Sequence, residues 1–181
     1  MTLRSELERL SPRELIEALS ICIYEPPLSV ARERFLAVPS AFRVAVLVLD
    51  FDTEVNMQGM LGFLENSTGL FLVETIEAFD LIGAKTTGDT LRRIQAILET
   101  HGVSPVQLRA DFAETMPYQI TTFNKLHGDL GSLPEEVQGE AMQLYIHAKP
   151  GCGEDVWALL DAFVEMNRDK ILAEIARFGD A

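Results

Sequence analysis

Histidines and cysteines are the side chains of this sequence best suited to catalysis or metal binding. His101, His127 and His147 are the three histidines, and no two of them lie three or four residues apart. A helical metal pair such as HExxH is therefore absent, and we expect surface or loop roles for all three unless the fold brings them together. Cys152 lies between two glycines at a predicted helix start, where a thiolate is favoured, but a lone loop cysteine is more often inert.

Acidic residues at alternate positions imitate the start of a calcium-binding loop. Asp50, Asp52 and Glu54 occupy the first three ligand positions of such a loop. Val55 stands where the loop needs glycine, and Leu61 stands where it needs a bidentate glutamate. We therefore exclude a calcium site of this type.

Sequence motifs of enzymes are missing as well. The sequence contains no GxSxG elbow, P-loop or GxGxxG motif, and the nearest glycine pair, Gly59 and Gly62, lies inside an apolar segment. We therefore predict a non-enzymatic protein with no cofactor and no metal. An enzyme whose histidines converge in the fold stays open as a third alternative.

Capping and stop signals in the sequence predict that the chain is mostly helical, so helices must position the residues described above. Ser11, Pro12 and Glu14 form a capping box with proline at the first helical position, which predicts a helix to about Glu25. Residues 44–49 are β-branched enough for a buried strand, but the apolar pattern continues through Met60, so we predict a helix from residue 41. Cap and stop signals predict further helices over about 29–37, 72–82, 87–100, 105–116, 119–127, 134–149 and 154–178.

Composition supports a single all-α globular domain of 181 residues. Hydrophobic residues make up 48% and charged residues 24% of the chain, which excludes disorder and a disulfide scaffold. The longest apolar run covers residues 44–49, whereas a membrane span needs about 20 apolar residues. The opening residues lack the apolar stretch of a secretory signal, and the two cysteines fit a reducing compartment, so we expect a cytoplasmic protein.

The net charge of −13 is concentrated in two segments. Residues 44–84 contain seven acidic residues and no Lys or Arg, and residues 126–167 contain eight acidic residues against Lys149 alone. Like charges four residues apart, such as Asp161 and Glu165, destabilise a helix by about 0.2–0.5 kcal/mol per pair, so their repetition hints at a function. Such a surface repels nucleic acid and attracts basic partners. The candidate partner-facing residues are Asp50, Asp52, Glu54, Glu65, Glu74, Glu77, Asp80, Glu136, Glu140, Asp161 and Glu165.

A motif over residues 54–84 resembles the signature of the DNA mimic protein family. The residues in register are Val55, Asn56, Gly59, Asn66, Ser67, Gly69, Ile82, Gly83 and Ala84. Gln58 and Met60 depart from the pattern, which has glycine and phenylalanine there. We expect the motif itself to be structural, because asparagine amides satisfy loop backbone and glycine permits positive φ or close approach.

The resemblance implies an all-helical, dimeric protein whose carboxylates imitate duplex phosphates and occupy the DNA site of a transcription regulator. Together with the charge distribution, it leads us to predict an acidic homodimer that binds a basic DNA-binding protein, either a transcription regulator or a nucleoid protein. We expect no direct nucleic-acid binding and no membrane partner. An interaction or immunity module that neutralises an unrelated basic partner, such as a toxin, is the alternative.

Overall fold

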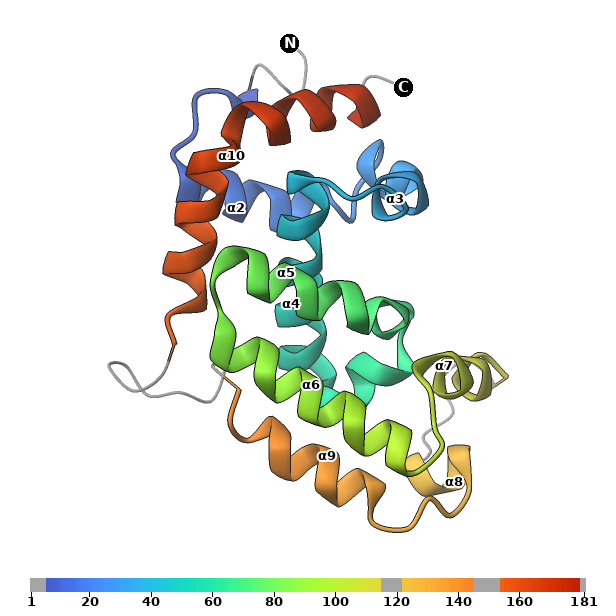
Figure 1. Ribbon diagram of the computed structural model, residues 1–181. Helices are drawn as coiled ribbons and strands as arrows, with labels where there is room; N and C mark the ends of the chain where they lie inside the picture. The colour runs from blue at the N-terminus through green and yellow to red at the C-terminus, as the bar shows by residue number, and fades with distance from the viewer. Residues whose placement is uncertain (1–5, 115–121, 145–153, 180–181) are drawn as a thin grey trace.

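The computed structural model describes residues 6–114, 122–144 and 154–179, and within these ranges it contains helices and no strand (Figure 1). The prediction of an all-α fold is confirmed. The elements are α2 (Pro12–Cys22), α3 (Leu28–Leu36), α4 (Ala41–Glu65), the 3-10 helix η1 (Ser67–Phe71), α5 (Leu72–Ile82), α6 (Lys85–Thr100), α7 (Pro105–Ala113), α8 (Phe123–His127), α9 (Leu133–Ala141) and α10 (Val156–Gly179).

Helix α4 is the central element of the fold and contacts α2, α3, α5, α7, α9 and α10 (Figure 1). Ser40 caps its N-terminus, where the side-chain oxygen accepts a hydrogen bond from the backbone N–H of Arg43 at 3.1 Å. Residues 44–49 are all buried within this helix, because neighbouring helices cover it on several sides. Phe51 continues the buried face and packs edge-on against Phe63 and Phe79, with ring centroids 5.1 Å apart in both pairs.

The remaining helices pack around α4 in two groups. Helices α5, α6 and α9 pack in succession, and α10 contacts α2, α3, α4 and α5 (Figure 1). Their buried apolar side chains form one contiguous core. In the described ranges, no helix is long and apolar enough to cross a membrane.

Three predicted helix ends depend on local sequence signals, and the structure confirms them. The capping box at α2 is present, since Ser11 and Glu14 exchange side-chain and backbone hydrogen bonds. Ser104 caps α7 through the N–H of Gln107 at 3.2 Å. Gly83 ends α5 in the left-handed conformation, with φ 87°. These three signals act within four residues, which is why the sequence reveals them.

Other predicted ends were wrong. Helix α2 stops at Cys22 rather than near residue 25, and α3 starts at Leu28 with no side-chain cap from Ser29. Helix α6 starts at Lys85, so Thr87 lies inside its first turn instead of capping it. Helices α7 and α9 are shorter than predicted, and α8 starts after Thr122. His147, Cys152 and the predicted helical residues 119–121 and 145–149 lie outside the described residues.

Candidate functional site

Asp50 lies in the protein interior and cannot form part of a surface for a partner. Its side chain is 3% exposed and forms an ion pair with Arg32 of α3. The hydroxyl of Tyr24 donates a second hydrogen bond to Asp50 Oδ1 at 2.9 Å. Burial raises the pKa of Asp50, and the nearby Arg32 guanidinium partly offsets that rise. The prediction of a partner-facing Asp50 is therefore wrong, because this carboxylate instead links α4 to α3.

Most of the other candidate carboxylates form ion pairs with bases from distant parts of the chain. The Arg13 guanidinium lies 2.6 Å from Asp161, which connects α2 with α10. Arg93 connects α6 with α9 through Glu140 at 2.7 Å. The other members of the candidate set with an arginine or histidine partner are Glu74 with Arg43 at 3.2 Å, Asp80 with Arg92, Glu136 with His101 at 3.4 Å, and Glu65 with His127 at 2.8 Å.

These tertiary ion pairs offset the repulsion between like charges that the sequence implies. Three pairs of acidic residues lie four positions apart on a helix, namely Asp50 and Glu54, Glu136 and Glu140, and Asp161 and Glu165. In each pair at least one carboxylate faces a cation from another helix. The compensation that is missing along each helix is therefore supplied by tertiary contacts.

Asp52 and Glu54 lie near the kink of α4 and bind the asparagines of the motif. The Asn56 amide donates to the Asp52 backbone carbonyl at 2.8 Å and to its carboxylate at 3.0 Å. The Asn66 amide donates to Glu54 at 2.8 Å, while its own oxygen accepts from the N–H of Ser67. Asn66 therefore joins the end of α4 to its middle and starts η1, which is the structural role expected of it.

Glycines of the motif allow the chain to turn and to pack closely. Gly59 has φ 73° and interrupts the regular backbone of α4, a conformation that side chains with Cβ disfavour. Gly69 faces the backbone of α4 directly, since a Cβ there would lie 2.5 Å from the Phe63 carbonyl oxygen and 2.8 Å from Leu64. No side chain fits in this contact, so η1 packs on α4 only with glycine at this position.

His127 is the centre of a buried polar cluster that sequence reasoning missed. Its Nε2 lies 2.8 Å from Glu65 of α4, and its Nδ1 lies 2.8 Å from Asp111 of α7. Both ring nitrogens therefore have a carboxylate partner within hydrogen-bond distance. The side chain is 1% exposed, which keeps substrate and solvent away. His127 therefore fastens α8 to α4 and α7 and is unsuited to catalysis in this fold.

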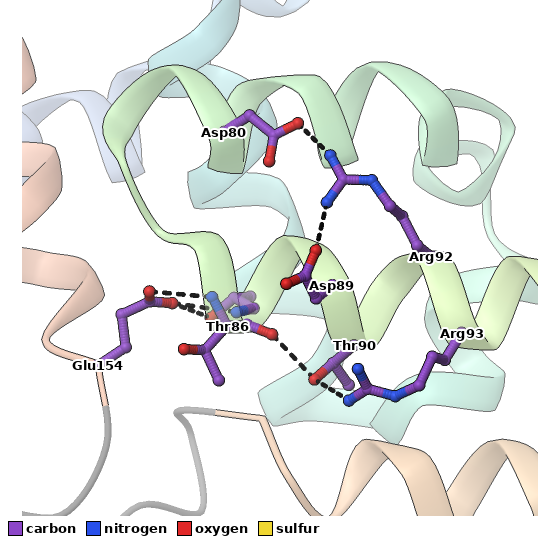
Figure 2. Close-up of polar contacts among 8 residues, drawn as sticks. Asp80, Thr86, Asp89, Thr90, Arg92, Arg93 and Glu154 are labelled. Atoms are coloured by element: carbon purple, nitrogen blue, oxygen red, sulfur yellow. Dashed lines mark hydrogen bonds and ion pairs between the residues drawn. The ribbon is translucent and has the colours of Figure 1, made fainter.

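The N-cap residue of helix α6, Ala84, has no side chain that could cap the helix, and Glu154 caps it instead. Its carboxylate accepts hydrogen bonds from the backbone N–H groups of Thr86 and Thr87 and from the Thr87 hydroxyl, each at 3.0 Å (Figure 2). The N–H groups at a helix start bind anions well, because they have no partner within the helix. Glu154 is 67 residues away from Thr87, so no local pattern could reveal the contact.

Two candidate carboxylates stay exposed without an ion pair to the described residues. Glu77 projects from α5 next to the paired Glu74, and Glu165 projects from α10 one turn after the paired Asp161. The structure therefore distributes the predicted residues over several helices, with two of them exposed and unpaired on α5 and α10. Within the three described ranges, no group of three His, Cys, Asp or Glu side chains could hold a metal ion.

These features define a class of protein: an all-α chain with a large excess of acidic residues, in which five arginines form internal ion pairs. A model of the DMP19-like protein family matches residues 37–149, which is more than half of the chain, so the protein belongs to this family of DNA mimic proteins. The family is not a known enzyme family. Comparisons with curated proteins and with solved structures gave no match.

Proposed function

We propose that this protein acts as a DNA mimic that binds a basic, DNA-binding protein through its unpaired surface carboxylates. The observation that carries the proposal is that arginines of this chain form ion pairs with its own carboxylates. Five arginines pair with carboxylates of the same chain, so they are not free to neutralise the remaining acidic residues. They are Arg13, Arg32, Arg43, Arg92 and Arg93, and the net charge of the chain is −13.

Spacing on the helices makes such mimicry physically reasonable. Duplex DNA carries one charge per roughly 1.7 Å of its axis. Carboxylates three or four residues apart on a helix lie about 5–6 Å from each other, and rows on two helices bring the density closer to that of DNA. Among the described residues, Glu77 on α5 and Glu165 on α10 are the unpaired members of two such rows, and membership of the family supports a phosphate-like role for them.

We propose in addition that the protein forms a two-fold dimer and is located in the cytoplasm. Its partner there would be a transcription regulator or a nucleoid protein. A two-fold axis doubles the array of carboxylates, and closed two-fold dimers are the commonest oligomers. The mutual repulsion of two chains of charge −13 opposes association at low salt. Light scattering at physiological salt tests the dimer, and a species of only 20.1 kDa would contradict it.

The function is tested by capture of the partner from native lysate, release with salt and identification, followed by competition with duplex DNA. We expect salt-sensitive binding and exclusion of DNA from the partner. The double variant Glu77→Gln and Glu165→Gln should bind about fivefold more weakly or worse. The control Glu25→Gln and Glu33→Gln removes the same charge from exposed positions within residues 1–43, where six acidic and six basic residues cancel, and should bind as wild type does.

Two results would contradict the proposal. One is simultaneous binding of DNA and this protein to the captured partner, which would show that the carboxylates do not occupy the DNA site. The other is equal weakening by both double variants, which would show that net charge alone attracts the partner. Capture of a basic toxin without a DNA-binding surface would favour the immunity alternative.

A further inference from the structure

A groove of about 470 Å³ lies where the first turns of α4 meet α5 and α10. Its apolar lining comes from all three helices and includes Val44, Ala78, Leu81 and Phe163. Leu81 is 63% exposed, although the other three side chains are buried. An exposed leucine in the wall of a groove offers apolar surface that a bound partner can cover.

Charged side chains around this groove leave it negative. Arg43 and Glu74 neutralise each other in an ion pair at 3.2 Å. Glu77 of α5 and Glu174 of α10 stand on two different walls, and Lys170 of α10 is the remaining cation in the lining. The charges of the groove therefore sum to about −1 near pH 7, with carboxylates facing it from two helices.

Arginine matches this combination of surfaces better than the other charged residues do. Its long stem is apolar and its planar guanidinium binds carboxylates, so stem and head can both be satisfied in one groove. The groove thus combines an exposed apolar side chain, Leu81, with carboxylates from two helices.

We propose that this groove is the docking site for an arginine-rich amphipathic helix of the basic partner. In this arrangement an arginine stem covers Leu81 while its guanidinium turns toward Glu77 and Glu174. A neighbouring apolar side chain of the same helix fills the rest of the lining, as in other helix-in-groove complexes. The inference rests on the proposed function, since it identifies where the basic partner binds.

A second groove provides a matched comparison within the same molecule. It measures about 230 Å³ and is lined by apolar side chains that include Leu70 and Val106, with Glu99 as its single charged residue. Leu70 and Val106 are also exposed, so both grooves present apolar surface. The second groove lacks carboxylates on two walls, so we expect the basic helix to bind the first groove.

The test uses synthetic helical peptides of about 18 residues, or five turns, in place of the unidentified partner. The first peptide presents arginine and leucine on one face, the second has every leucine replaced by alanine, and the third has every arginine replaced by glutamate. Binding is measured by titration at two salt concentrations, and the contact surface is mapped by NMR on the full chain. We expect the first peptide to perturb Val44, Leu81 and Phe163 and to keep part of its affinity at high salt. The second should lose that salt-resistant part, and the third should not bind.

Variants at exposed positions separate the groove from the general charge. Leu81→Ala should weaken binding of the first peptide about fivefold, and Glu77→Lys about tenfold or more. Lys170→Gln should strengthen binding, because it removes the one unpaired cation of the lining. The controls Leu70→Ala and Glu99→Lys make the same two changes in the second groove and should shift the affinity less than about twofold.

The inference is overturned if NMR maps the first peptide elsewhere, or if Leu81→Ala binds it as tightly as wild type does. Either result leaves the DNA-competition experiment with the captured partner unaffected. Conversely, a captured partner that binds DNA and this protein at once would end the mimicry proposal, while the peptide data would still show whether the groove binds a basic helix. The two failures are therefore distinguishable.

Discussion

The buried ion pair between Arg32 and Asp50 predicts that Arg32→Gln strongly destabilises the protein. Asp50 is 3% exposed and Arg32 is 22% exposed, so the substitution leaves a carboxylate inside the protein without its cation. Removal of one partner from a buried ion pair costs about 3–5 kcal/mol in free energy of unfolding. Asp50 keeps its hydrogen bond from Tyr24, and Arg32 is partly solvated, so we expect a loss of about 2–3 kcal/mol.

Urea unfolding at pH 7 measures this loss, which corresponds to a decrease of about 5–10 °C in Tm for a chain of this size. Arg34→Gln is the matched control, because Arg34 lies on the same helix α3 and is exposed. It should change the free energy of unfolding by no more than about 0.5 kcal/mol. Adding Asp50→Asn to Arg32→Gln should recover part of the stability, since the unpaired charge is then gone.

The effect of pH follows from the pKa of Asp50. Burial raises this pKa in the folded state, so the folded chain keeps the proton to a higher pH than the unfolded chain does. The contribution of Asp50 to the free energy of unfolding therefore falls as pH rises from about 4 through the folded-state pKa. Loss of the Arg32 charge raises that pKa further, so the penalty of Arg32→Gln should grow as pH rises from about 4 toward 7. A penalty equal to that of Arg34→Gln, or one unchanged between these pH values, would refute the reasoning.

Four further substitutions test other parts of the fold by urea unfolding. Glu154→Gln should cost about 0.5–1.5 kcal/mol, because the cap of α6 loses its charge, and a cost of zero would mean that Glu154 does not cap in solution. His127→Gln should cost about 1–3 kcal/mol, since the buried imidazole loses one or both of its contacts to Glu65 and Asp111, and wild-type stability would contradict the cluster. Gly69→Ala should cost about 2 kcal/mol or more by collision with backbone, whereas Gly139→Ala, in open space on α9, should stabilise by about 0.5–1 kcal/mol. The same sign for both glycine variants would contradict the packing of η1.

The fold could be predicted from the sequence because its helix boundaries depend largely on neighbouring residues. The capping box at Ser11, the serine cap at Ser104 and the left-handed Gly83 all act within four residues of the chain. The start of α6 could not be predicted in this way. Its cap comes from Glu154, and the nearest local candidate, Thr87, instead donates its hydroxyl to that same carboxylate.

The sequence shows where the acidic residues lie, but it does not show which of them are paired or buried. Repulsion between Asp161 and Glu165 is visible in the sequence because it acts over four residues. The cation that offsets it, Arg13, is 148 residues away from Asp161 and becomes visible only in the structure. Asp50 had the same charge as the others in the sequence, and only its burial shows that it belongs to the core.

Under the proposed function, internal pairing also determines which carboxylates would be recognised by a partner. A carboxylate bound to arginine presents little net charge, so Asp161 and Glu140 contribute less to attraction than their number suggests. Their pairs nevertheless connect α10 with α2 and α9 with α6, which holds the helices at fixed positions. Recognition of a duplex-like array requires fixed spacing as well as charge, because a flexible surface loses entropy when a partner orders it. On the proposed function, the paired carboxylates would therefore hold the helices in place, and unpaired carboxylates such as Glu77 would supply the negative potential that attracts the partner.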